Sequence, residues 1–156
     1  MNLDTDQFAQ HLASELSLTT ALQTLLKEER QALVSQDIEQ LQALQATKQA
    51  LLNHIQSAAH QRLRWMEDNQ LPTSPACLEH PQVQSHADIA TTWQALAASY
   101  EFNRDYSEHL SDLVLKARYR TQQQLKILHG RQNDSHLYNQ DGKASGVNRG
   151  KGYVQA

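Results

Sequence analysis

The fold is decided between residues 25 and 52, which read LLKEERQALVSQDIEQLQALQATKQALL. Spacings of three and four link Leu26, Glu29 and Leu33 before residues 35–37, and Leu41, Leu44, Lys48 and Leu51 after them, which is the pattern of amphipathic helices. The link Ser35-Gln36-Asp37 is so short that the second helix must turn back along the first. Asp37 can cap that second helix, with Gln40 three positions further on. The stretch therefore predicts an antiparallel helical hairpin.

The periodic pattern extends in both directions from this link and predicts helices over about residues 5–35 and 38–69. Asp4 stands before the first helix and can cap it, with Gln7 as its capping-box partner. Folding the chain at the link brings opposite each other positions whose numbers sum to 73 or 74. Phe8 should therefore face Trp65.

Several a and d positions of these heptads are polar, namely Glu15, Glu29, Lys48, Arg62 and, in a third helix, Asn103. We expect Glu15 and Arg62 to lie about one helical turn apart across the seam, and Glu29 and Lys48 likewise. Such residues commonly fix the register of a coiled coil at some cost in stability. The alternative is that they line a cleft shared with a client helix.

A third long helix is predicted over about residues 85–129, after a proline-rich loop at residues 71–84 that holds all three prolines. The residues of this helix that should face the hairpin or a second chain are Trp93, Leu96, Tyr100, Leu110 and Val114. We expect this helix to end at Gly130, because glycine is common just past a helix C-terminus.

The composition agrees with an all-α fold. Leu, Ala and Gln make up 61 of 156 residues, and the first 71 residues contain neither Gly nor Pro, so the frequent turns of a sheet protein are missing. No run of 18 apolar residues could span a membrane, and the N-terminus lacks the features of a signal peptide. We therefore expect a coiled-coil-like domain over residues 1–130, a long hairpin plus a third long helix, located in the cytoplasm.

Residues 131–156 read RQNDSHLYNQDGKASGVNRGKGYVQA and differ in composition from the rest. Residues 1–112 carry a net charge of −9 and residues 113–156 one of +6, an asymmetry that often marks a region with a partner. Spaced apolar residues in a glycine-rich, polar segment are typical of coupled folding and binding. The sequence thus predicts a flexible, partner-binding C-terminal tail.

No arrangement of residues in the sequence points to catalysis or metal binding, so we expect neither an enzyme nor a cofactor. Cys77 and His80 form one C-x-x-H pair without the second pair that a zinc site requires. His109 is better interpreted as an exposed polar residue than as a phosphorelay histidine.

Two segments carry a resemblance to a known family. One is the hairpin of residues 25–52, and the other is Leu137-Tyr138-Asn139-Gln140-Asp141-Gly142-Lys143. They resemble the helical hairpin and the short C-terminal tyrosine and Asp-Gly motif of the FlgN family, the flagellar export chaperones of bacteria. Asn103 matches a polar position in the family's last long helix, so the resemblance covers nearly the whole chain.

The resemblance implies a cytoplasmic chaperone that binds the hook–filament junction proteins FlgK and FlgL, prevents their premature assembly and delivers them to the export gate protein FlhA. It places client binding in the C-terminal helical region and gate docking at Tyr138. The partner-binding residues that we expect are Leu125, Leu128, Leu137, Tyr138, Asp141, Gly142, Val147 and Tyr153.

Two other functions compete with this interpretation. A structural coiled-coil adaptor or scaffold without an export role would show the same heptads. Nucleic-acid binding through the basic C-terminal end is less favoured, because the aromatic residues there do not alternate with Lys and Arg to form a stacking platform. We expect no membrane insertion, and a homodimer is compatible with the long apolar seams.

Overall fold

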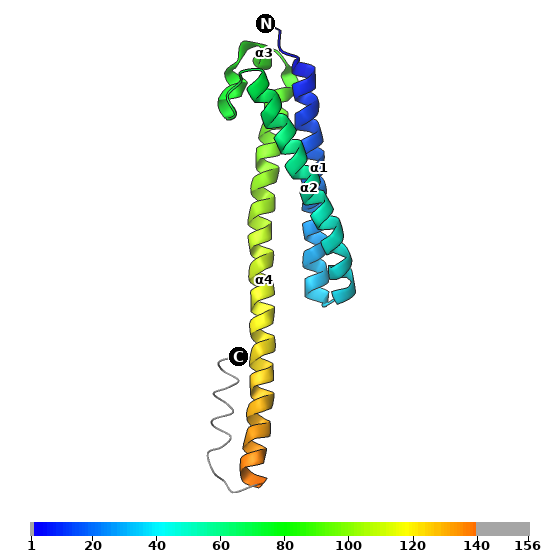
Figure 1. Ribbon diagram of the computed structural model, residues 1–156, viewed down its shortest axis with the longest axis vertical. Helices are drawn as coiled ribbons and strands as arrows, with labels where there is room; N and C mark the ends of the chain where they lie inside the picture. Colours follow the sequence, from blue (N-terminus) through cyan, green and yellow to red (C-terminus); the bar gives the residue numbers. More distant parts are fainter. Residues whose placement is uncertain (1, 140–156) are drawn as a thin grey trace. The chain divides into compact units, whose positions relative to one another are not determined.

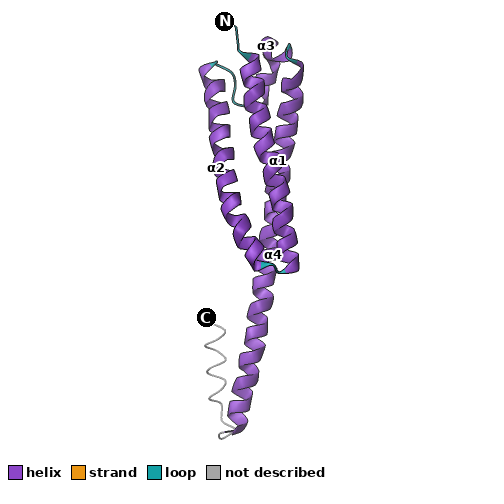
Figure 2. Cartoon of the chain, turned by 90° about the vertical axis from the view of Figure 1, so that its right-hand side faces the viewer, coloured by secondary structure: helices purple, strands orange, loops and turns teal. Residues whose placement is uncertain are grey.

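The computed structural model describes residues 2–139, with side chains described for residues 2–130. In chain order it holds α1 (Thr5–Ser35), α2 (Ile38–Asp68), the 3₁₀ turn η1 (Pro75–Glu79), the short helix α3 (Pro81–Gln84) and α4 (Ala87–Asn139). These elements are all helical, as Figure 2 shows, and the described part has no strand. The all-α prediction is confirmed. None of the described helices combines the length and the apolar character that a membrane span requires.

The chain divides into two compact units, Met1–Leu110 and Ser111–Ala156. The first unit holds α1, α2, η1, α3 and the part of α4 up to Leu110, and the second unit begins within α4. The division that the sequence predicts after residue 130 stays a prediction, because residues 140–156 lie outside the described part.

The hairpin of α1 and α2 forms as predicted, and Figure 1 shows α2 returning along α1 and crossing it. The Asp4 Oδ1 accepts a hydrogen bond from the Gln7 backbone N–H at 3.0 Å, and the Asp37 Oδ1 accepts one from the Gln40 N–H at 3.1 Å. Between the helices Gln36 takes the left-handed conformation, with φ 57° and ψ 35°. This conformation costs a non-glycine residue roughly 1–2 kcal/mol. The tight reversal is therefore held against local strain by the packing of the two helices.

The core of the first unit lies where the N-terminal end of α1 meets the C-terminal end of α2. The rings of Phe8 and Trp65 stack with centroids 4.8 Å apart and planes 9° apart, as the pairing rule predicts. The Trp65 Nε1 donates to the Gln7 Oε1 at 2.9 Å, so the Gln7 side chain satisfies the polar group of the stacked Trp65 ring. The buried cluster around this stack consists of Phe8, Leu12, Trp65, Met66, Leu71, Cys77, Val83, Ile89 and Leu96.

The N-terminal part of α4 packs on this hairpin through the face that the heptads predict. Leu96 and Leu110 are 3% and 4% exposed, and Trp93 and Tyr100 are partly buried against the core cluster. Val114 is half-buried and belongs to the second unit. The prediction for α4 is therefore confirmed within the first unit.

The proline-rich loop of residues 71–84 contains more structure than the sequence predicts. Pro75 and Pro81 occupy the first turns of η1 and α3. Proline favours this position because its fixed φ suits a helix and its missing N–H is not needed there. Ser74 caps η1 and His80 caps α3 through their side chains. The α4 helix then begins at Ala87, two residues later than expected.

The predicted end of the third helix at Gly130 is wrong, because α4 continues to Asn139. A Cβ atom built on Gly130 meets nothing within 4 Å, so no close packing requires a glycine there. Glycine in a helix interior costs about 1 kcal/mol relative to alanine, which weakens a helix without ending it. No proline follows in residues 131–139 to stop the helix.

Leu110 and Leu115 offer a matched test of this packing, since both lie on α4 but are 4% and 60% exposed. Leu110→Ala should lower the free energy of unfolding by about 2–5 kcal/mol, because it empties a buried site. Leu115→Ala should change it by less than about 0.5 kcal/mol. Urea unfolding followed by circular dichroism measures both values. Equal effects of the two variants would show that Leu110 is not part of the core.

Candidate partner-binding surface

A single buried carboxylate, that of Glu15 on α1, joins three helices. The Arg62 guanidinium on α2 donates from Nε to the Glu15 Oε1 at 2.6 Å and from Nη2 to Oε2 at 3.3 Å. The Tyr100 hydroxyl on α4 donates to the Glu15 Oε2. Glu15 is 0% exposed, so these contacts replace its hydration. The predicted Glu15–Arg62 pair is confirmed, and Tyr100 is its additional partner.

The surroundings of Tyr100 shift its protonation strongly. Burial raises the pKa of the Tyr100 hydroxyl well above its usual 10.0, and the hydrogen bond to the negative Glu15 raises it further. The positive charge of Arg62 acts in the opposite direction with a smaller effect. Arg62 also lies over the Trp93 ring, 5.6 Å from its centroid, which favours the guanidinium further. Tyr100 therefore stays a proton donor to Glu15 throughout the neutral range.

A second polar contact ties the helices nearer the turn of the hairpin. The Lys48 Nζ lies 3.1 Å from the Glu29 Oε2, and the Gln45 Nε2 donates to the Glu29 Oε1 at 3.0 Å. The side chain of Glu29 is 9% exposed and that of Lys48 25% exposed. This is the predicted pairing of Glu29 with Lys48, and it fixes the same register as the Glu15–Arg62 pair.

The third polar contact joins α4 to α1. The Asn103 Nδ2 donates to the Thr19 backbone carbonyl at 2.9 Å. Within the described residues, the buried Asn103 Oδ1 and Ser99 Oγ have no hydrogen-bond partner. The polar residues of the seam thus bind one another or the backbone of this chain. These contacts within the chain support the interpretation that the polar residues set the register of the helices. They disfavour the alternative that these residues line a cleft shared with a client helix.

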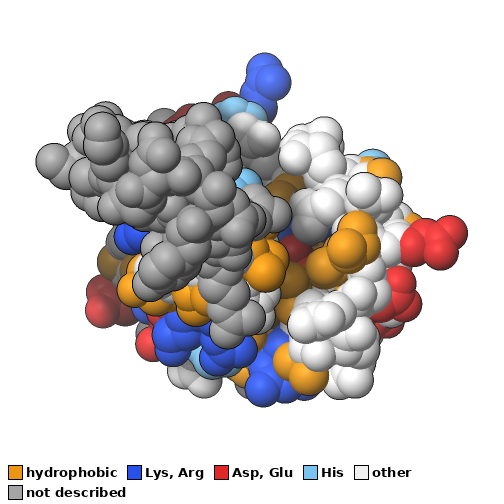
Figure 3. Space-filling view, turned by 90° about the horizontal axis from the view of Figure 1, so that it is seen from below, with side chains coloured by type: hydrophobic (Ala, Val, Ile, Leu, Met, Phe, Trp, Pro, Cys, Tyr) orange, Lys and Arg blue, Asp and Glu red, His pale blue; other side chains and the backbone are white. Residues whose placement is uncertain are grey.

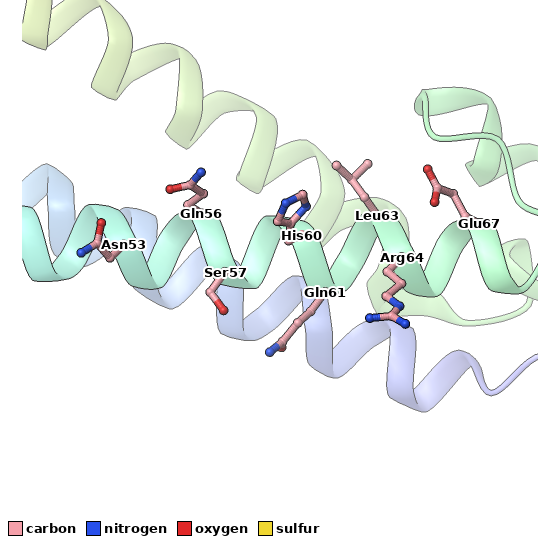
Figure 4. Close-up of a pocket in the computed structure, with 8 residues that line it drawn as sticks. All are labelled: Asn53, Gln56, Ser57, His60, Gln61, Leu63, Arg64 and Glu67. Carbon is pink, nitrogen blue, oxygen red and sulfur yellow. The ribbon is translucent and has the colours of Figure 1, made fainter.

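A hollow of about 700 Å³ lies along α2 and is the subject of Figure 4. Its lining comes from α2 and consists of Asn53, Gln56, Ser57, His60, Gln61, Leu63, Arg64 and Glu67. In Figure 4, Gln56, His60 and Glu67 lie on one side of the helix, and Ser57, Gln61 and Arg64 lie on the other. Catalytic groups must converge on one reacting atom. This hollow is therefore an open polar face of α2.

The C-x-x-H pair has a structural role. Cys77 is buried, and burial raises the pKa of its thiol, while the charge of Arg62 lowers it to a smaller extent. The His80 Nδ1 accepts a hydrogen bond from the Gln82 backbone N–H at 3.2 Å and so caps α3. Residues 2–130 hold no group of three or more His, Cys, Asp or Glu side chains that could bind a metal ion.

The structure describes two of the eight predicted partner-binding side chains. Leu125 and Leu128 lie on α4 and are 51% and 54% exposed. Leu137 and Tyr138 belong to the last turns of α4 by their backbone, and their side chains lie outside the described residues. The other four, Asp141, Gly142, Val147 and Tyr153, also lie outside the described part.

Leu128 continues the a and d pattern of α4 into the second unit, and Leu125 lies at the flanking e position next to Gln124 at d. Residues at spacings of three and four share one face of a helix. We call the face formed by Val114, Ala117, Thr121, Leu125 and Leu128 the α4 stripe. The Thr121 hydroxyl donates to the Ala117 carbonyl at 3.0 Å, so its polar group is satisfied within the helix. The stripe thus presents mainly apolar atoms to a partner.

Sequence reasoning missed other exposed apolar residues in this segment. Leu115, Tyr119 and Ile127 are 60%, 63% and 55% exposed. They lie off the α4 stripe by their helical positions. The high density of large apolar residues between positions 113 and 128 indicates them, whereas the heptad pattern does not include them.

The α4 stripe lies in a basic segment. Residues 113–130 contain Lys116, Arg118, Arg120 and Lys126 and no Asp or Glu. All four bases are exposed. Figure 3 shows Lys and Arg side chains beside hydrophobic ones on the face that it presents. An apolar stripe with cations on its flanks suits an amphipathic helix as a partner.

The comparison with protein families finds a match over nearly the whole chain. The family described as FlgN protein matches residues 1–146. Searches of curated proteins and of solved structures gave no significant match. The matched range includes the hairpin, the seam contacts, the α4 stripe and the predicted tyrosine motif.

The raised pKa of Tyr100 predicts a loss of stability in alkali. The unfolded chain releases this proton near pH 10, whereas the folded chain retains it, so the folded state loses stability as the pH rises above about 10. Tyr100→Phe removes this term, and its free energy of unfolding should fall less between about pH 9 and pH 11.

Urea titrations at several pH values measure this loss, and Tyr119→Phe is the control because Tyr119 is 63% exposed. Tyr119→Phe should follow the wild type. If wild type and Tyr100→Phe lose equal stability over this range, the tyrosine does not act as the buried donor to Glu15.

Proposed function

The chain belongs to the FlgN family of flagellar export chaperones, and on that premise we propose that it binds the hook-associated proteins FlgK and FlgL in the cytoplasm. It keeps these subunits from assembling too early and delivers them to the export gate protein FlhA. The observation that carries the proposal is the match to this family over residues 1–146 together with the exposed α4 stripe within that range.

The α4 stripe has the properties that a client-binding surface needs. A subunit whose terminus later assembles as a coiled coil exposes apolar heptads while it is still monomeric. A helix with its own exposed heptads can cover them. Leu125 and Leu128 remain about half exposed, so each can lose a substantial apolar area on binding.

Release of the client is also compatible with this surface. Ala117 and Thr121 contribute little apolar area at the centre of the stripe, and Leu125 and Leu128 supply the larger anchors. Affinity then depends on few large side chains. Transfer to the export machinery requires that such a complex can dissociate.

The first prediction of the proposal concerns the two leucine anchors. The double variant Leu125→Ala, Leu128→Ala should weaken client binding at least about tenfold, because it removes the large apolar side chains of the stripe. Leu115→Ala is the control, since Leu115 is also more than half exposed and lies off the stripe. Titration of purified FlgK and FlgL into each variant measures the affinities. A wild-type chain that binds neither client would contradict the proposed function.

The second prediction concerns Tyr138 and the export gate. A tyrosine offers a large apolar ring and one hydroxyl at a low cost in conformational entropy, so it suits a docking anchor. Tyr138→Ala should weaken binding to the cytoplasmic part of FlhA by about fivefold or more, with client affinity and melting temperature unchanged. Equal gate affinities of wild type and variant would remove Tyr138 from the docking role.

A further inference from the structure

The heptad positions of α4 place two arginines directly beside the α4 stripe. The alternating spacings from Asn103 through Leu110, Val114 and Ala117 continue to Thr121, Gln124 and Leu128, and Leu125 follows Arg118 by one heptad. In this register Arg118 follows a d position and Arg120 precedes an a position, so they occupy e and g. These are the positions whose charges select partners in coiled coils.

Both arginines are available to a partner. Arg118 and Arg120 are exposed, and no carboxylate within residues 2–130 forms an ion pair with either of them. The acid-free segment of residues 113–130 offers them no acidic neighbour along the helix. Asp112, the acidic residue directly before this segment, lies on the outer face of the helix in the same register.

We propose that the α4 stripe selects an amphipathic helix that carries acidic residues at the positions flanking its apolar seam. This inference rests on the proposed function and names the chemistry of the client helix. Acidic side chains opposite Arg118 and Arg120 form ion pairs, while the apolar seam covers Leu128 and Leu125 packs at its edge. Charge complementarity of this kind sets specificity and association rate more than affinity.

The same charges disfavour two other occupants. A second copy that paired through this segment would bring Arg118 and Arg120 of both chains into the interface, with no acidic residue between positions 113 and 130 to compensate. A nucleic acid would bind the Lys and Arg side chains through its phosphates, but those phosphates make no favourable contact with the apolar stripe. The stripe and its flanks together therefore point to an acidic helix.

The test uses three synthetic peptides of about four heptads each, the length that stable helix pairing needs. The first carries Leu at a and d with Glu at e and g, the second carries the same leucines with Lys at e and g, and the third carries Glu at e and g with Ser at a and d. Each is titrated into the full-length chain at low salt and at about 0.15 M salt. Intact FlgK and FlgL are titrated in parallel.

The wild type should bind the Leu/Glu peptide at least about threefold more tightly than the Leu/Lys peptide at low salt, and added salt should reduce the difference. The variant Arg118→Glu, Arg120→Glu should reverse the preference. The control Arg30→Glu, Arg64→Glu makes the same change in net charge at exposed positions of α1 and α2, and should keep the wild-type preference.

Several results would overturn the inference. Equal affinities for the Leu/Glu and Leu/Lys peptides would exclude charge selection, and equal binding of the Ser/Glu peptide would indicate a general attraction for polyanions. Self-association of the wild type that Leu125→Ala, Leu128→Ala abolishes would assign the stripe to a second copy. If the wild type binds FlgK or FlgL without a peptide preference, this inference fails and the proposed function stands. If it binds the Leu/Glu peptide but neither client, the proposed function fails.

Discussion

The arrangement of the first unit depends on one buried charge. The Glu15 carboxylate has no exposed surface, and Arg62 of α2 and Tyr100 of α4 occupy its two oxygens. Removing one partner of a buried pair typically costs about 3–5 kcal/mol, because it leaves the other charge without compensation. A shift of α2 by one residue, or of α4 by one turn, would separate these groups. Apolar packing alone tolerates such shifts far better, so the carboxylate gives the bundle its single register.

Sequence reasoning recovered the contacts that the short link determines, and missed those that depend on a third element. Three residues between α1 and α2 fix which positions meet, so the Phe8–Trp65 stack and the Glu15–Arg62 pair could both be predicted. The region between α2 and α4 is longer and irregular, so the heptads gave the face of α4 but not the partner of Tyr100. The same limit applied to helix ends. Asp4 and Asp37 bind specific backbone N–H groups and mark starts reliably, whereas Gly130 only weakens a helix and did not mark an end.

The candidate site was predictable to a smaller extent, for a physical reason. A heptad pattern predicts which residues share a face of a helix, but it does not predict whether another element or a partner covers that face. The seam of α4 reads alike at Leu110 and Leu128, yet the first residue is 4% exposed and the second 54%. Only the structure separates these cases. What does differ in the sequence is the flanking charge, since acidic residues are frequent up to Asp112 and absent from 113 to 130.

This difference in flanking charge suggests how one repeated pattern can serve two purposes along the same helix. Within the first unit, polar seam residues are matched by partners in the chain: Asn103 binds the Thr19 carbonyl, and Tyr100 binds Glu15. Beyond residue 112, the seam holds Val114, Ala117, Thr121, Gln124 and Leu128, none of which is charged, and cations stand at its edges. A buried polar contact favours one fixed register, because any other register leaves it unpaired. An apolar stripe with charges only at its rim tolerates several partners of the same charge pattern. The first part of the helix is therefore suited to specifying the fold, and the second, in the function that we propose, to accepting related client helices in turn.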